Sequence, residues 1–379
     1  MNFDLSDREI EVRNLARDFS RNEILPDVMK YDETQEFPFE IAKKLGELGF
    51  LGIIFPEKYG GSNFTTVEYA LIIEEISKVD PSIGLTIAAH NGLCTSHIYN
   101  FANEEQKMKY LPDLTSGKKL GAWGLTENVS GSDAQSLATI AEKKDGYYLL
   151  NGSKMFITHG KVGETAVITA LTDKENRKIS AFILEKGMGG FRSGKKENKL
   201  GMRASDTSEL IFENVKVPIE NLIGNEGDGF KQALKILDSG RIAIAALSLG
   251  VAEGALDACI KYSKQRKQFG KYLAEFQATQ FKIAEISTDI EAARLLIYKA
   301  AQMKDNGEEI NLSASIAKLF ASEIAVKATN EAVQIHGGYG YIKEFPVEKL
   351  YRDVKLLTIG EGTSEVQRMI IARTIQKLF

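Results

Sequence analysis

The sequence of 379 residues has few of the residues that build a disulfide or metal framework. Its two cysteines, Cys94 and Cys259, lie far apart and form no ligand or redox pattern, so neither a disulfide scaffold nor a zinc site is expected. The four histidines form no spaced cluster, and we predict no metal. His90 and His97 fall in an apolar segment and are interpreted as buried core groups with satisfied hydrogen bonds.

The chain also lacks a basic surface signal. Its 48 Lys and Arg residues are dispersed among 52 Asp and Glu residues, for a formal net charge of -4. A nucleic-acid partner is therefore not expected. The acidic, amphipathic start, MNFDLSDREIEV, matches neither a secretory signal nor an Arg-rich transit peptide, and the predicted location is the cytoplasm.

One charge-free stretch, residues 81–103, is long enough to raise the question of a membrane span. Proline and several polar side chains interrupt its apolar character. We therefore predict a buried helix here and no membrane span. The interrupting residues are Pro81, Ser82, His90, Asn91, Thr95, Ser96 and His97.

Helical patterns fill the first third of the chain. Ser6 and Glu9 form a predicted capping box, and Leu5 can staple onto Ile10, so a helix should begin there. Apolar residues at Ile41, Leu45 and Leu48 indicate a second helix. A third pattern runs through TTVEYALIIEEISKV, and Pro81 is expected to end it.

The pattern changes near Gly117. Strand-like segments follow in SLATIAEKK and YYLLNGSKMFIT, with Asp145-Gly146 and Asn151-Gly152 as expected turns, and then in AVITAL, ISAFILE and SELIFENVKV.

Long helical patterns return after GNEGDGF, and the small apolar residues of RIAIAALSLGVAEGALDACI occupy every face, as in a helix inside a bundle. The predicted fold is α+β and mostly α. We expect an N-terminal helical domain over 1–116, a β-barrel-like domain over 117–226 and an antiparallel helix bundle over 227–379.

Common nucleotide and hydrolase motifs are missing. There is no GxxxxGK[ST], and GGYGYI follows no predicted strand, so neither a P-loop nor a Rossmann site is supported. GLTENVSGSD fails the GxSxG spacing. What remains is a single carboxylate, Glu361, between two glycines at the start of a helical pattern.

Six segments, in this order and spacing, resemble the acyl-CoA dehydrogenase family over essentially the whole chain: WGLTENVSGSDA, NGSKMFITHG, KLGMRASDTSELIFENVKVP, SKQRKQFGK, EAVQIHGGYGY and YRDVKLLTIGEGTSEVQR. The resemblance implies an FAD enzyme that removes two hydrogens from the α and β carbons of an acyl-CoA thioester, giving a trans-2-enoyl-CoA. It also implies the helical, β, helical order described above.

The resemblance makes Glu361 the catalytic base that takes the α-proton. Burial beside an acyl chain and a flavin should raise the pKa of this carboxyl, whereas the start of the following helix, with Ser364 and Gln367 as an expected capping pair, should lower it. We expect burial to dominate. Without the resemblance, Glu361 would be interpreted as a helix cap or an ion-pair partner. Gly240 occupies the position where isovaleryl-CoA dehydrogenase carries its base, and glycine cannot act as one.

For the flavin ring, the resemblance implies two segments. Thr126 would hydrogen-bond the pyrimidine edge, and Thr158 would face N5. Phe156 replaces the more usual tryptophan, which keeps the aromatic wall and loses the indole N–H. The residues implied for this half of the site are Trp123, Leu125, Thr126, Ser132, Phe156, Ile157 and Thr158.

The diphosphate and adenine of FAD would be reached from a neighbouring subunit. An arginine fork suits a diphosphate, and adjacent glycines allow close backbone approach. The implied residues are Arg266, Gln268, Phe269, Phe276, Gln277, Gln334, Ile335, Gly337 and Gly338, with Thr363 and Glu365 completing the site. A shared site implies a homotetramer arranged as a dimer of dimers.

The acyl-CoA would contact Ser132, Asp238, Arg241, Gly360 and Gly362. Gly360 stands where many straight-chain members carry tyrosine, and IAAHNGLC resembles the isovaleryl enzyme, so short straight and short branched acyl groups both remain open. The resemblance further implies electron-transferring flavoprotein as the acceptor and a place in fatty acid β-oxidation or branched-chain amino acid catabolism. Two alternatives are kept: an acyl-CoA oxidase or other flavoenzyme on the same fold, and a non-catalytic assembly protein.

Overall fold

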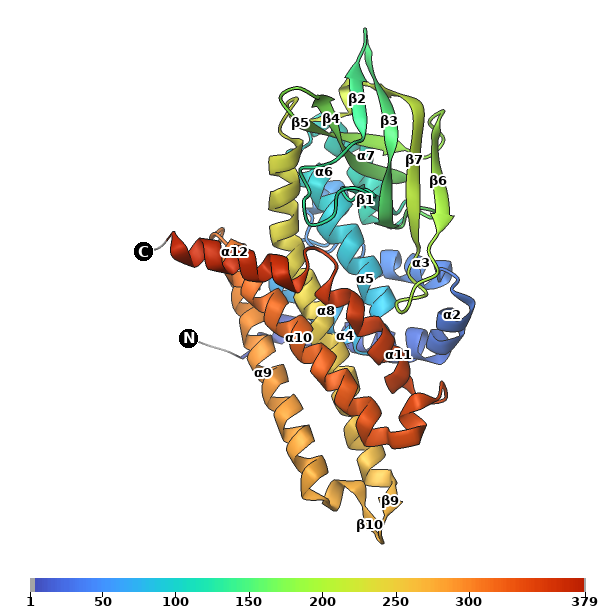
Figure 1. Cartoon of the computed structure of the whole chain (residues 1–379), viewed down its shortest axis with the longest axis vertical. Coiled ribbons are helices and arrows are strands. Elements are labelled where there is room, and N and C mark those ends of the chain that lie inside the picture. Colours follow the sequence, from blue (N-terminus) through green and yellow to red (C-terminus); the bar gives the residue numbers. More distant parts are fainter. Residues whose placement is uncertain (1–3, 378–379) are drawn as a thin grey trace.

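The computed structural model describes residues 4–377, in which helices, strands and helices follow one another along the chain, and the sheet lies at the upper end of the molecule in Figure 1. The N-terminal group of helices, blue to cyan in the figure, lies beside the long helices of the C-terminal part. This order confirms the predicted α+β, mostly helical fold. The N-terminal helices are α1 (Asp7–Phe19), α2 (Val28–Thr34), α3 (Phe39–Glu47), α4 (Thr66–Ser77), α5 (Pro81–Ala89), α6 (Ser96–Phe101) and α7 (Glu104–Thr115).

Local capping explains where these helices begin. Ser6 caps α1, and Ser6 and Glu9 form the predicted capping box. The expectation for Pro81 was wrong, because α4 already ends at Ser77 and Pro81 is the first residue of α5. Proline is favoured at that position since its missing N–H has no partner there, and the side chain of Asp80 caps the helix.

The central part forms one eight-stranded sheet in the order β6-β7-β3-β2-β4-β5-β8, with β1 pairing parallel to β4. The turn predicted at Asp145-Gly146 joins β2 to β3. Asn151-Gly152 is not a turn: both residues lie inside β3, where the register with β7 shifts between Leu150 and Gly152. The strands are β1 (Gly121–Gly124), β2 (Ile140–Lys143), β3 (Tyr147–Thr158), β4 (Thr165–Asp173), β5 (Lys178–Glu185), β6 (Phe191–Lys196), β7 (Thr207–Pro218) and β8 (Leu222–Ile223).

The C-terminal part is built on α8, which runs from beside the sheet to the far end of the molecule (Figure 1). A small hairpin, β9 (Lys267–Gln268) and β10 (Lys271–Tyr272), follows at that far end. The helices of this part are α8 (Gly229–Gln265), α9 (Gln277–Asp305), α10 (Asn311–His336), α11 (Pro346–Asp353) and α12 (Ser364–Gln376).

Helix α8 is the core helix of the molecule. Its residues 240–252 are all buried, and it contacts α4, α9 and α10. It is also the one helix of residues 4–377 whose length and apolar composition would suit a membrane span, with 72% of the apolar window buried inside the protein. Such burial is typical of the central helix of a globular core.

Candidate active site

Glu361 lies on a short loop between the 3-10 turn Val354–Thr358 and α12. Glu361 has φ +53° and Gly362 has φ +94°, so two successive residues adopt the left-handed region. The carboxylate lies directly against α8. A Cβ placed on Gly240 would come within 2.0 Å of Glu361 Oε2, so the glycine makes room for the acid.

Burial decides the protonation of this group. Burial raises the pKa of Glu361 from its usual value to about 7, and the nearby charges of Lys318 and Arg241 oppose that rise. The pKa is raised, as expected from burial, and the opposing groups are these two cations. Glu361 Oε2 is buried and has no hydrogen-bond partner within residues 4–377, which leaves it available to a ligand.

The carbonyl groups of the loop are held by buried donors. Gln367 Nε2 donates to the carbonyls of Glu361 at 3.3 Å and Gly362 at 3.1 Å, and Lys318 Nζ donates to Gly362 at 2.7 Å. The predicted capping pair was therefore wrong. Thr363 caps α12 by accepting from the N–H of Val366, and the side chain of Gln367 turns back to the loop.

Asp238 and Arg241 lie one turn apart on α8, beside Gly240. Arg241 is buried and donates to Asp238 Oδ1 at 2.5 Å, and Asn311 Nδ2 donates to the same oxygen at 2.8 Å. Arg241 Nε has no partner among the described residues. The structure thus places Asp238 and Arg241 next to the Glu361 carboxylate, with Gly360 and Gly362 on the adjoining loop.

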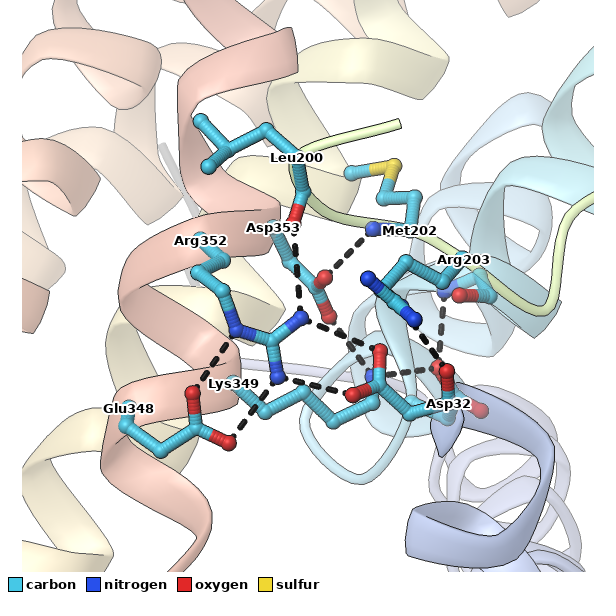
Figure 2. Close-up of polar contacts among 10 residues, drawn as sticks. Asp32, Leu200, Met202, Arg203, Glu348, Lys349, Arg352 and Asp353 are labelled. Carbon is cyan, nitrogen blue, oxygen red and sulfur yellow. Dashed lines mark hydrogen bonds and ion pairs between the residues drawn. The ribbon is translucent and has the colours of Figure 1, made fainter. Parts of the chain in front are cut away.

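An ionic cluster on α11 fixes the other end of this loop (Figure 2). Asp353 Oδ1 accepts from the Met202 N–H at 2.5 Å, and Asp353 Oδ2 accepts from Lys349 Nζ at 2.6 Å. Lys349 also reaches Asp80 at 3.0 Å. Arg352 binds Asp32 with two nitrogens, at 2.7 Å and 3.2 Å. The cluster therefore joins the N-terminal helices, the loop before β7 and the helix that leads to Glu361.

The two predicted flavin segments lie side by side. The N–H of Met155 donates to the carbonyl of Thr126 at 2.9 Å, so the loop after β1 contacts the end of β3. Phe156 has φ +60° at a register shift in β3. Its exposed fraction is 63%. Ile157 is buried and Thr158 is half-buried. An exposed ring held by a strained backbone suits the wall of a ligand site.

A buried ion pair that the sequence did not reveal joins these segments. Lys154 Nζ on β3 donates to Glu127 Oε1 at 2.6 Å and to the Leu125 carbonyl at 3.1 Å. Glu127 in turn accepts from the N–H groups of Ala138 and Thr139. Burial lowers the pKa of Lys154 to about 8 although Glu127 opposes the shift. A charged residue inside a strand, facing a conformationally irregular loop, is the signal that could have indicated this pair.

Trp123 is held by its indole. Its Nε1–H donates to His97 Nδ1 at 3.0 Å, and His97 Nε2 lies 3.0 Å from Gln232 Oε1. Burial lowers the pKa of His97 to about 4, so the ring is neutral. His90 is also buried and bonded, to the Leu114 carbonyl and the Gly121 N–H. The interpretation of both histidines as satisfied core groups is confirmed.

A second group of predicted residues surrounds a separate cavity of about 570 Å³ at the far end of α8. Arg266 faces the ring of Tyr339 at 5.3 Å, and a Cβ on Gly337 or Gly338 would meet no atom within 4 Å. A guanidinium, aromatic rings and open glycine backbone fit a diphosphate and an adenine. The predicted residues lining this cavity are Arg266, Gln268, Ile335, Gly337 and Gly338.

Other predicted residues lie outside both groups. Phe269 is 93% exposed on the hairpin and contacts Phe276 edge-on, with Gln277 next to it at the start of α9. Gln334 is exposed on α10, and Ser132 is exposed on the loop after β1. Glu365 is exposed beside Thr363 in the first turn of α12.

The chain matches three family models along its length: acyl-CoA dehydrogenase N-terminal domain over 6–118, middle domain over 122–215 and C-terminal domain over 227–376. It is 50% identical to an acyl-CoA dehydrogenase of Bacillus subtilis (strain 168), covering 97% of this chain and 98% of that protein. A short-chain specific acyl-CoA dehydrogenase of Clostridium acetobutylicum is 48% identical, with 99% of this chain and 100% of that protein covered.

Solved structures agree. Butyryl-CoA dehydrogenase from Megasphaera elsdenii superposes with a TM-score of 0.97 at 46% identity, over 99% of this chain and 100% of that chain. These matches, over all three parts of the chain, identify an FAD-dependent enzyme of the dehydrogenase class. The chain belongs to the acyl-CoA dehydrogenase family. The predictions of family, enzyme class and FAD as cofactor are confirmed.

Proposed function

We propose that the protein dehydrogenates short-chain acyl-CoA thioesters to trans-2-enoyl-CoA, with Glu361 as the base. The observation that carries this proposal is the Glu361 carboxyl, which has an unpartnered buried oxygen and a pKa raised by burial to about 7. A base of this pKa can take a proton at neutral pH and return it.

The residues of the chain divide the work. Glu361 removes the α-proton, and the N–H of the same residue donates to the thioester carbonyl, which acidifies the α carbon. Gly360 and Gly362 allow the acyl group to approach. Bound FAD supplies the acceptor for the hydride of the β carbon. Phe156, Ile157, Thr158 and Thr126 hold the flavin, and Asp238, Arg241 and Ser132 contact the CoA thioester.

Two subunits share each FAD in this proposal. Gly240, against the base, and Arg266, the C-cap residue of α8 at the second cavity, lie about 39 Å apart along this helix at 1.5 Å per residue. One extended cofactor cannot bridge that length within a chain. The exposed Phe269, Gln277 and Gln334 and the half-buried Phe276 would therefore complete the site of a neighbouring subunit in a homotetramer, a dimer of dimers. Thr363 and Glu365 would belong to the first subunit.

The short acyl chain rests on the relatives. Enzymes of Clostridium acetobutylicum and Megasphaera elsdenii, each 48% identical, are named short-chain specific. Gly360 lacks the aromatic ring that would narrow the pocket near the β carbon, so we include short branched substrates, with fatty acid β-oxidation or branched-chain amino acid catabolism as the pathway. The proposed location is the cytoplasm, and the proposed domain boundaries stay at 1–116, 117–226 and 227–379.

Electron-transferring flavoprotein is the proposed redox partner. A relative from Acetobacterium woodii, 45% identical over 98% of this chain, is named caffeyl-CoA reductase-Etf complex subunit CarC. The name of that complex includes Etf, so we expect this chain, which is similar over nearly its whole length, to pass its electrons to an electron-transferring flavoprotein as well.

The same observation supports a second candidate, reduction of a 2-enoyl-CoA in the reverse direction. An acryloyl-CoA reductase (NADH) from Anaerotignum propionicum is 42% identical over 100% of this chain. In that direction protonated Glu361 would give its proton to the α carbon, and bound FAD in its reduced form would supply the hydride for the β carbon. A pKa near 7 leaves both forms populated at neutral pH, so the base serves either direction.

The test is a titration of the FAD-loaded enzyme with butyryl-CoA, isobutyryl-CoA and isovaleryl-CoA while the visible flavin absorbance is followed. Wild-type enzyme should bleach with at least one of them. Glu361→Gln should retain FAD and bleach at least about 10³-fold more slowly, since the base is missing. The control Glu344→Gln, an exposed glutamate, should match the wild type.

Three outcomes would contradict the proposal. Rapid bleaching of Glu361→Gln would remove the base from its role. Oxygen consumption that keeps pace with turnover would identify an oxidase. Absence of bound flavin in the purified wild-type protein, with no gain on adding FAD, would favour the non-catalytic alternative.

A further inference from the structure

A fully buried lysine lies behind the catalytic loop. Lys318 on α10 has no exposed surface, and its neighbours on the same helix face are small residues, alanines and serines. Burial lowers the pKa of this ammonium to about 8. A buried cation is unfavourable unless another group pairs with it or accepts its hydrogen bonds. The neighbours on that face are Ala314, Ser315, Ala321, Ser322 and Ala325.

The partner of the Lys318 ammonium is the backbone next to Glu361. Lys318 Nζ donates to the Gly362 carbonyl at 2.7 Å. Glu361 and Gly362 both have left-handed φ angles, so neither helix nor strand hydrogen bonds hold this turn. A side-chain donor from another helix therefore fixes the backbone that aims the Glu361 carboxylate.

The surroundings of the loop indicate a site built for a ligand. Four buried side-chain atoms of this loop and its neighbours lack a hydrogen-bond partner among the described residues: Glu361 Oε2, Arg241 Nε, Ser364 Oγ and Gln367 Oε1. Buried polar atoms are rarely left without partners in a finished core. Lys318 is not among them, because its ammonium is committed to the loop.

We propose that Lys318 is a positioning residue for Glu361: its buried ammonium fixes the Gly362 carbonyl and supplies positive charge that favours the ionised base. The inference rests on the proposed function of Glu361. The charged and titratable groups that act on Glu361 or on Lys318 come from four helices. They are Tyr69 on α4, Arg241 on α8, Glu323 on α10 and Glu365 on α12, and Asp238 on α8 acts on Arg241.

The sign of the effect follows from the charges. Arg241 is already paired with Asp238, so Lys318 is the cation near Glu361 that no carboxylate contacts in the described chain. Removing it leaves burial less opposed, and the pKa of Glu361 rises above about 7. At neutral pH a smaller fraction of the enzyme then holds the base in its reactive form.

The experiment compares Lys318→Met and Lys318→Arg in the FAD-loaded enzyme, with Lys327→Met as control on the same helix. Lys327 is exposed and pairs with Asp289. The Glu361 carboxyl is titrated by infrared difference spectroscopy, with its band assigned by loss in Glu361→Gln. Lys318→Met should raise this pKa by about one pH unit. Lys318→Arg and Lys327→Met should titrate close to the wild type.

Kinetics give a second readout. The pH profile of flavin reduction by butyryl-CoA should move to higher pH by the same amount in Lys318→Met, which is about a ten-fold slower rate at acidic pH. If Lys318→Met does not fold, Lys318→Gln supplies the neutral variant. A neutral variant whose carboxyl titrates as in the wild type would overturn the inference, and so would an equal shift in Lys327→Met.

Failure of the proposed function is distinguishable from failure of this inference. If Glu361→Gln bleaches rapidly, the proposed function fails. The infrared titration needs no turnover, so the link between Lys318 and the Glu361 carboxyl is still measured there.

Discussion

Glu361 shows a conflict between stability and chemistry. The loop bends through two left-handed residues to bring a carboxylate against Gly240, where water is largely excluded. Burial raises the pKa of the acid to about 7. A group with such a raised pKa binds its proton more tightly in the folded protein than in the unfolded chain, so ionising it opposes folding.

This conflict predicts that Glu361→Gln is more stable than the wild type at alkaline pH. The folded-state pKa is about 7 and the ordinary value is 4.5, so wild-type stability should fall as pH rises through this window. Glutamine has no such proton. We expect its gain in unfolding free energy to be about 1–3 kcal/mol at pH 8 and close to zero below pH 4.

Urea unfolding of both proteins at several pH values measures the gain. Glu344→Gln, an exposed glutamate on the loop before α11, is the matched control and should change stability by less than about 0.5 kcal/mol. A gain independent of pH would contradict the assignment of the cost to ionisation.

At the scale of elements, α11 works as the anchor of the catalytic loop. Its last turn carries Arg352 and Asp353, whose partners come from the N-terminal helices and from Met202 (Figure 2). A short segment then links Met202 to Asp206, whose carbonyl accepts from the His159 N–H beside Thr158. The segment that leads to Glu361 and the end of the flavin wall are thereby tied to one cluster.

We predict that Asp353→Asn destabilises the protein. The amide can still accept from the Met202 N–H, but Lys349 loses one of its two buried carboxylate partners. Breaking a buried pair by removing one charge typically costs 3–5 kcal/mol, and since Asp80 remains we expect about 2–3 kcal/mol.

An exposed ion pair supplies the control for this variant. Arg192 and Glu213 form a 3.0 Å contact with both side chains more than half exposed, and Glu213→Gln should change the unfolding free energy by less than about 0.5 kcal/mol. Equal losses in urea unfolding for the two variants would show that the α11 cluster is no stronger than a surface pair.

Local signals predicted most elements of this fold. The capping box of Ser6 and Glu9 marked α1, and the Asp145-Gly146 turn marked the β2–β3 hairpin. The turn predicted at Asn151-Gly152 was wrong because the pairing of β3 with β7 determines the backbone conformation there. Gly152 lies at a register shift of this pairing and packs against Thr139. The prediction that Pro81 ends a helix was wrong because a proline can either follow one helix or begin the next.

The site also contains residues that the sequence predicted and residues that it did not. Glu361 was found from the family resemblance of its loop, and its raised pKa followed from burial. Lys318 was missed because its partner, the Gly362 carbonyl, lies on a distant segment and is a backbone group. A single lysine on a helix face of alanines and serines was the available signal, and Lys154 inside β3 was a similar one.

At the scale of the whole molecule, α8 separates the two ends of the proposed FAD site. The base lies against Gly240 in the first third of α8. The cavity with Arg266 is lined in part by Gln268 of the β9–β10 hairpin, which lies at the far end of the molecule (Figure 1). The same helix thus contributes to two different cofactors if the enzyme is a tetramer. A single subunit would then hold half of one site and half of another.

This arrangement predicts recovery of activity by mixing two inactive variants. Glu361→Gln lacks the base, and Arg266→Ala should lose FAD because the diphosphate loses its arginine fork. In a mixed assembly, one site combines Glu361 from the second variant with Arg266 from the first and is intact, whereas the opposite site carries both defects.

Co-expression with two affinity tags, followed by tandem purification, isolates the mixed species. We expect up to about half of the wild-type rate of butyryl-CoA-dependent flavin bleaching per site, because one site of each pair is restored. Pure samples of each variant should remain inactive after the same purification. If both halves of the FAD site came from one chain, every site in the mixed assembly would carry one defect, and activity would stay at the level of the two parents.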